Sequence, residues 1–262
     1  MDKSLKFKIK QSLKTAIKNF FKNQKPESFH VLNYIFPRER RIRSLIGGLE
    51  TSMGTTVWEP IARTLAESNK YEQLQVIAPK LLMPAPFPKK LQNELNKLIH
   101  ERQARFLSTE ECINRLKEAA LKANINNLQY INPPSGTGVD IYFLSNKGIE
   151  YAFDIKTSQS NKGDFKKFNT QLLEWYAYRF SKNPDVNFKA RIAIPFNPFN
   201  KDWYVQQKLK ISPPLDQTKD IWVEDEFWDF CSGDSNTWES IKQVFIELGE
   251  ENFGGEFQKL FE

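Results

Sequence analysis

Two aspartates and a lysine stand at the ends of two apolar segments in the middle of the chain. Asp140 opens the first segment, and Asp154 and Lys156 end the second. Both segments are rich in aromatic and β-branched residues, and Ser-Asn-Lys-Gly (145–148) joins them, which predicts a β-hairpin. Because side chains alternate faces along a strand, Asp154 and Lys156 share a face, and antiparallel pairing brings Asp140 beside them. We therefore expect three charged side chains to converge at one end of the hairpin.

This combination of charges is typical of a metal site that cuts phosphodiesters. Two neighbouring carboxylates repel each other unless a cation lies between them. Mg²⁺ suits Asp140 and Asp154, because it prefers a few carboxylates together with water and phosphate oxygens. The metal could then polarise a phosphodiester and activate a water molecule, while Lys156 stabilises the developing charge or orients the water. The spacing is short, however, and an ordinary Asp–Lys ion pair at a strand end would give the same pattern.

Basic and amide side chains follow the hairpin and could contact DNA. The six candidates are Lys162, Lys166, Lys167, Asn197, Asn200 and Lys201. Lysines near the hairpin suit phosphate oxygens, and asparagines can read base edges. The arginines of the segment RERRIR (38–43) offer a further basic stretch. Each of these residues could equally be plain surface, so the sequence does not identify which of them read bases.

The surrounding sequence predicts a mixed α/β fold that positions these side chains. Helical periodicity marks four segments, which are 4–23, 37–69 with a Gly-containing break, 88–125 with a restart at 108–111, and 164–183. Either Ser108 or Thr109 could cap the restarted helix. Residues 187–200 and 201–212 are expected to be strands, and the C-terminal third is expected to be helical. This order predicts a mixed β-sheet flanked by helices, with Tyr151, Phe153 and Ile155 facing the core.

Composition narrows the classes of protein to which the chain could belong. The 262-residue chain carries a net charge of +6, with eight lysines against one acid in residues 1–25 and thirteen acids against three lysines in residues 216–262. Such asymmetry favours a polyanionic partner, although basic surfaces are often only solvated. Cys112 and Cys231 are expected to be reduced thiols of a cytoplasmic protein. Two histidines are too few for a His-rich metal nuclease, and no apolar run predicts a membrane span.

The hairpin also resembles a known nuclease motif. Asp140, thirteen further residues and then Asp154-Ile155-Lys156 resemble the PD-(D/E)xK motif, with Val139 where proline is usual. Residues 52–67, 153–179 and 190–199 are similar to blocks of the TdeIII-type family of type II restriction endonucleases. The resemblance implies a restriction endonuclease-like core and Mg²⁺-dependent hydrolysis of double-stranded DNA at a short palindrome, GGNCC-like in this family. It also implies a homodimer and a cognate DNA methyltransferase as functional counterpart.

The resemblance carries expectations about organisation and about further site residues. It implies a single domain over 1–262, with a helical part (1–125), a catalytic core (about 126–210) and an acidic helical part (211–262). Many such nucleases add a glutamate from an N-terminal helix to the metal site, and here Glu59 fits that role better than Glu50. Gln171 and Tyr178 are expected to line the site. Two alternatives stay open: another nuclease of this fold in DNA repair or junction resolution, and a non-catalytic DNA-binding module.

Overall fold

The computed structural model describes residues 1–22, 30–78, 80–123, 127–156, 160–199 and 201–261. The chain forms two compact units. The helical unit combines residues 1–69 with residues 228–262, and the sheet unit comprises residues 70–227. The sheet unit holds Asp140, Asp154 and Lys156. These units cut across the three predicted segments, because the helices of residues 89–121 pack with the sheet. A single domain over the whole chain stays a prediction.

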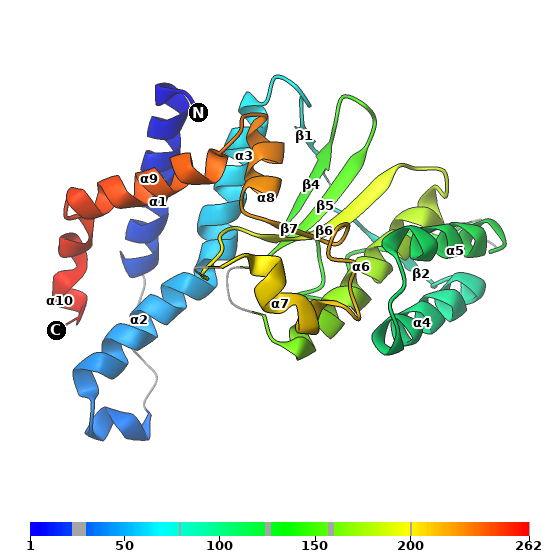
Figure 1. Ribbon diagram of the computed structural model, residues 1–262, viewed down its shortest axis with the longest axis horizontal. Coiled ribbons are helices and arrows are strands. Elements are labelled where there is room, and N and C mark those ends of the chain that lie inside the picture. Colours follow the sequence, from blue (N-terminus) through cyan, green and yellow to red (C-terminus); the bar gives the residue numbers. More distant parts are fainter. Residues whose placement is uncertain (23–29, 79, 124–126, 157–159, 200, 262) are drawn as a thin grey trace. The chain divides into compact units, whose positions relative to one another are not determined.

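The sheet unit is built on a mixed β-sheet, which confirms the predicted fold class (Figure 1). Within the described residues it has five strands, in the order β1 (Gln75–Val76), β4 (Ile141–Leu144), β5 (Glu150–Ile155), β6 (Phe188–Ile194) and β7 (Ile221–Val223). β4 pairs antiparallel with both β1 and β5, whereas β6 pairs parallel with both β5 and β7. A second, two-stranded sheet joins β2 (Met83–Ala85) to β3 (Gln129–Ile131). The central position of β5 places Asp154 deep in the fold.

The predicted hairpin is confirmed as β4 and β5. Ile141 pairs with Phe153 in the antiparallel register, so Asp140 lies one residue outside β4 and next to Asp154. The turn between the strands contains Gly148 at a φ of +71°, a backbone conformation that favours glycine. The register therefore brings the two aspartates together at the same end of the hairpin.

Both faces of β5 are buried, whereas the sequence predicted the core only on the Tyr151 and Phe153 face. On the other face, Ala152 belongs to a hydrophobic cluster with residues of α6 (Lys162–Lys182). Phe153 contacts Trp222 and Phe227 in an aromatic cluster on its own face. A central strand with parallel neighbours is normally covered on both sides. Asp154, which shares the face of Ala152, is consequently a core residue and not a surface one.

Helices α4 (Lys89–Ala104) and α5 (Thr109–Leu121) pack against α6 (Figure 1). The predicted restart at 108–111 is confirmed, since the side chain of Ser108 caps α5 by accepting a hydrogen bond from the backbone of Glu111. The buried Arg102 of α4 donates to Asp220 at 2.7 Å and to Thr109 at 2.9 Å. This ion pair connects the two helices to the residue just before β7.

Residues 201–212 do not form the expected strand. They contain α7 (Trp203–Ile211), which Asp202 caps by accepting a hydrogen bond from Val205 N–H. The buried residues of α7 are Trp203, Gln207 and Ile211, and this spacing of four is helical. The predicted strand was wrong because the aromatic and β-branched residues favour a strand, whereas the apolar positions recur every four residues and favour a helix.

The helical unit contains the two chain ends. Its elements are α1 (Lys3–Lys22), η1 (Val31–Tyr34), α2 (Pro37–Met53), a π-helical turn η2 (Gly54–Trp58), α3 (Glu59–Ser68), α9 (Thr237–Glu250), η3 (Phe253–Phe257) and α10 (Gln258–Phe261). The expected break in residues 37–69 is thus a π-helical turn. Helix α8 (Asp225–Ser232) crosses the boundary of the two units. None of the described helices is long and apolar enough to cross a membrane.

The opposite charges of the two chain ends pair with each other inside the helical unit. Lys10 of α1 lies 2.9 Å from Glu247 and 2.7 Å from Glu251, and Lys14 lies 2.7 Å from Glu251. Lys18 similarly lies 2.8 Å from Glu256. Much of the basic charge of α1 is therefore neutralised by the acidic C-terminal segment. The charge asymmetry of the sequence consequently does not translate into a free basic face along these lysines.

Candidate active site

Asp140 is fixed to the neighbouring strand by its backbone and by its side chain. Its backbone N–H donates to the carbonyl of Phe153 at 2.9 Å, and its Oδ2 accepts a hydrogen bond from the backbone N–H of Ile155 at 2.7 Å. These two hydrogen bonds involve the residues immediately before and after Asp154. They hold the Asp140 carboxylate at the end of β5, where the sequence predicted it.

Asp154 is a buried acid whose negative charge is only partly compensated by its neighbours. Its side chain is only 4% exposed, and Lys156 Nζ lies 2.8 Å from both of its carboxylate oxygens. Lys156 donates a hydrogen bond to Oδ1, and the same ammonium is in ion-pair contact with Oδ2. Burial raises the pKa of Asp154 to about 7, the Lys156 ammonium opposes this rise, and the Asp140 carboxylate adds to it. The site therefore favours a cation next to these two acids.

Lys156 leaves β5 at the edge of a groove. Its backbone N–H donates to the carbonyl of Ala193 on β6 at 3.0 Å, and its ammonium lies 5.8 Å from the ring centroid of Phe168. The side chain is 34% exposed, so the ammonium is anchored by Asp154 and is still accessible to a ligand. All three predicted core residues of the site therefore lie together, as their spacing indicated.

A cavity of about 540 Å³ lies between Lys156 and one face of α6, and we refer to it as the candidate catalytic groove. Lys167, Gln171 and Glu174 of α6 line it, and their spacing of four and three residues places them on one face of the helix. Gln171, expected from the resemblance, has a buried amide nitrogen without a partner among the described residues. Glu174, whose pKa is raised by burial, was not predicted as a site residue. The helical spacing from Lys167 onwards could have identified it.

The carboxylates suit a hard divalent cation. Burial raises the pKa of Asp154, and the carboxylate of Asp140 beside it raises that pKa further. A cation bound by Asp140 and Asp154 would remove the repulsion between them. Mg²⁺ is commonly held by one or two carboxylates, with water and phosphate oxygens completing its shell. Among the described residues, no group of three or more His, Cys, Asp or Glu side chains is placed to hold a metal ion.

The predicted DNA-contacting residues fall into three groups. Lys162, Lys166 and Lys167 are exposed on the first turns of α6, close to the groove. Asn197 is already engaged in its own loop, because it donates to the carbonyl of Lys201 at 2.9 Å and accepts from the backbone of Phe199 at 2.9 Å. Lys201 is exposed, and Asn200 lies outside the described residues. DNA contact by these residues stays a prediction.

The two candidate glutamates belong to the helical unit. Glu59 is the first residue of α3, its side chain is 12% exposed, and it lies 3.5 Å from Arg63. Glu50 is exposed on α2. The role of either residue at the metal site stays a prediction. Tyr178, also expected at the site, instead lines a second pocket of the sheet unit.

The sequence of the chain is similar to those of known restriction enzymes. The family model for "Type II restriction endonuclease, HinfI" matches residues 1–249. The type II restriction enzyme MjaII of Methanocaldococcus jannaschii is 22% identical over 221 residues, which cover 80% of this chain and 55% of that protein. The type II restriction enzyme HgiCII of Herpetosiphon aurantiacus is 26% identical over 110 residues, which cover 42% of this chain and 39% of the relative.

The chain thus spans about half the length, or less, of these curated relatives. The matches confirm the resemblance to type II restriction endonucleases, and the family that they name is HinfI, whereas the sequence blocks had suggested the TdeIII type. The chain belongs to the HinfI family of type II restriction endonucleases.

Proposed function

We propose that this protein is a type II restriction endonuclease that hydrolyses phosphodiester bonds of double-stranded DNA with the help of Mg²⁺. One observation carries the proposal: Asp154 is a buried acid that pairs with Lys156 beside a second acid, Asp140, at the end of the central hairpin, and its pKa is raised. A purely structural ion pair would not normally have a second carboxylate held against its acid. The membership of the chain in a restriction endonuclease family supports the same chemistry.

Each side chain has a defined task in this proposal. Asp140 and Asp154 would hold the Mg²⁺, which when bound polarises the phosphodiester and lowers the pKa of an attacking water. Asp140 is held in place for this by the backbone N–H of Ile155. Lys156, kept at the edge of the groove by Asp154, stabilises negative charge that develops on the phosphate. Lys167 adds positive charge along the same groove, where a DNA backbone would lie.

The finer parts of the proposal follow from the family resemblance. A short palindromic target, GGNCC-like, would be read by a homodimer whose two-fold symmetry matches that of the DNA. The enzyme would work in the cytoplasm, and a cognate DNA methyltransferase would protect the same sequence in the host.

The test is a cleavage assay on a long DNA of known sequence, with Mg²⁺ and with EDTA, followed by sequencing of the fragment ends. Wild-type protein is compared with Lys156→Ala and Asp154→Ala. A matched control, Lys97→Ala, removes an exposed lysine of α4 from the same unit. We expect discrete fragments that share one short palindrome, only with Mg²⁺ and only for wild type and Lys97→Ala.

Other outcomes would replace the proposal in defined ways. Cleavage confined to branched or damaged DNA would identify a junction or repair nuclease of the same fold. DNA that is bound but never cut, with all four proteins, would identify a binding module. In that case Asp154 and Lys156 would be an ordinary ion pair.

A further inference from the structure

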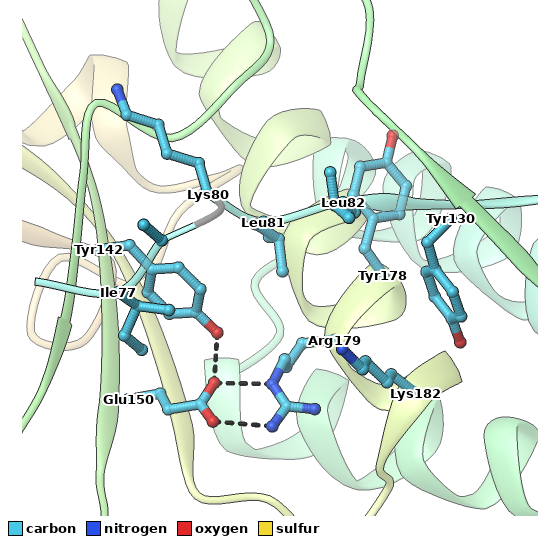
Figure 2. A pocket seen from close by; sticks show the side chains of 11 residues that line it. Ile77, Lys80, Leu81, Leu82, Tyr130, Tyr142, Glu150, Tyr178, Arg179 and Lys182 are labelled. Carbon is cyan, nitrogen blue, oxygen red and sulfur yellow. Dashed lines mark hydrogen bonds and ion pairs between the residues drawn. The ribbon is translucent and has the colours of Figure 1, made fainter.

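Figure 2 shows a second pocket of the sheet unit, which Glu150 lines. Glu150 stands at the opposite end of β5 from Asp154. The volume of the pocket is about 240 Å³, and its apolar walls include Leu81, Leu82 and Tyr178. Glu150 begins β5 and Asp154 is its fifth residue, so the two sites are separated by about 13 Å along the strand. The pocket is therefore distinct from the candidate catalytic groove.

An ion pair with a spare donor forms the polar side of this pocket. Arg179 of α6 donates two hydrogen bonds to the Glu150 carboxylate, from Nε to Oε2 at 2.6 Å and from Nη2 to Oε1 at 2.7 Å. The hydroxyl of Tyr142 donates to the same carboxylate, as Figure 2 shows. The acceptors of Glu150 are thus engaged, whereas Nη1 of Arg179 is buried and has no hydrogen-bond partner among the described residues. The guanidinium of Arg179 consequently keeps one buried donor that its ion pair does not use, and such a group is costly to leave unpaired.

Lys182 adds a second cation at the edge of the pocket. It follows Arg179 by three residues on α6, so both side chains leave the same side of the helix. Its ammonium lies 5.8 Å from the ring centroid of Tyr130, which also lines the pocket. Arg179 and Lys182 together outweigh the single negative charge of Glu150. A cation near a helix C-terminus is favourable in itself, but this does not supply an acceptor for Arg179 Nη1.

We propose that this pocket is a binding site for a phosphate group. A phosphate offers acceptor oxygens only, which suits the guanidinium of Arg179 and the ammonium of Lys182, the two cationic groups of α6 that line the pocket. Guanidinium and ammonium groups are the usual protein partners of phosphate, and charge-assisted hydrogen bonds of this kind are strong. The phosphate could belong to the DNA backbone or to a free phosphate. Both sources share the same chemistry, and the same helix α6 lines the candidate catalytic groove and this pocket.

The test measures binding of inorganic phosphate by isothermal titration calorimetry, in EDTA and at physiological ionic strength, so that no cleavage is involved. Lys182→Gln is the main variant, because it leaves the Glu150–Arg179 pair intact. Arg179→Lys is the second variant, and thermal unfolding establishes that each is folded. Lys97→Gln is the control for loss of one exposed lysine outside the pocket. We expect phosphate to bind wild type and Lys97→Gln equally, and Lys182→Gln about ten-fold more weakly.

A short DNA duplex is then added to the phosphate-saturated wild type. Displacement of phosphate by the duplex would identify the DNA backbone as the source, and retention would identify a free phosphate. The proposal is overturned if inorganic phosphate does not bind wild type, or if Lys182→Gln and Arg179→Lys bind it as tightly as Lys97→Gln does. Because no step requires cutting, failure here is separate from failure of the proposed nuclease activity.

Discussion

Replacing Asp154 with asparagine should stabilise the metal-free protein while it abolishes cleavage. The two interpretations of the Asp154–Lys156 pair predict opposite signs for this change. A structural ion pair that loses its buried acid leaves a lysine without its partner and lowers stability. A functional acid that is held in the core without full compensation lowers stability while it is present, so its removal raises stability.

The size of the effect follows from the burial of the carboxyl group. Raising its pKa from 3.8 to about 7 corresponds to a cost of about 4 kcal/mol for the ionised form. The folded protein then binds the proton more tightly than the unfolded chain, so stability falls as the pH rises from about 4 to 7. Above pH 7 the full cost applies. Asparagine escapes it but buries an imperfectly paired amide, at about 1–3 kcal/mol. We therefore expect Asp154→Asn to be about 1–3 kcal/mol more stable at pH 8.

The assay is urea unfolding in EDTA, followed by far-ultraviolet circular dichroism at several values between pH 4 and pH 8. The difference in free energy of unfolding between Asp154→Asn and wild type should shrink steadily towards pH 4, because the wild-type carboxyl is then protonated and no charge is buried. Asp185→Asn, which alters an exposed acid of the same unit, should show no comparable change. If Asp154→Asn were less stable than wild type at pH 8, the pair would be structural and the reasoning refuted.

Three further changes test other parts of the structure. Lys167→Gln should weaken binding to DNA of any sequence and reduce the slope of log affinity against log salt by about one, as measured by fluorescence anisotropy; an unchanged slope would exclude a phosphate contact. Arg102→Met leaves Asp220 charged and buried, and should lower the free energy of unfolding in urea by about 3–5 kcal/mol. Adding Asp220→Asn, which removes the charge and keeps a side-chain acceptor for Thr109 and the backbone of Asp216, should recover part of that loss, and no recovery would contradict a cost due to the unpaired charge. Glu59→Gln should slow Mg²⁺-dependent cleavage about 10- to 100-fold in initial-rate measurements while Glu50→Gln stays near wild type, and the reverse order would move the role to Glu50.

The hairpin and its three charged residues could be predicted because the relevant information is local. Strand alternation and one turn are sufficient to place Asp140, Asp154 and Lys156 together. α7 was mispredicted, although the spacing of Trp203, Gln207 and Ile211 is helical, because apolar runs of this length suit both helix and strand. Strands as short as β1 and β7 carry too few residues for any period to be recognised.

Ion pairs between distant parts of the chain could not be predicted from the sequence for a different reason. Lys10 and Glu251 are separated by most of the chain, so composition shows a basic end and an acidic end without showing that they neutralise each other. The loop contacts of Asn197 are equally invisible, because an asparagine that holds a turn and one that reads a base look identical in sequence. Glu174 needed the position of α6 relative to the groove, which only packing determines.

The position of Asp154 shows why this end of the hairpin is the candidate site. On the same face of β5 stands Ala152, and the neighbouring β6 contributes Ile192, so an aliphatic residue would suit the position. An acid there is stabilised by the Lys156 ammonium and destabilised by the Asp140 carboxylate. Hydrogen bonds to Asp140 hold that second acid close by, so the fold maintains the repulsion instead of relaxing it. A local conflict that the surrounding structure preserves is typical of a functional site, and a bound cation is the partner that would resolve it.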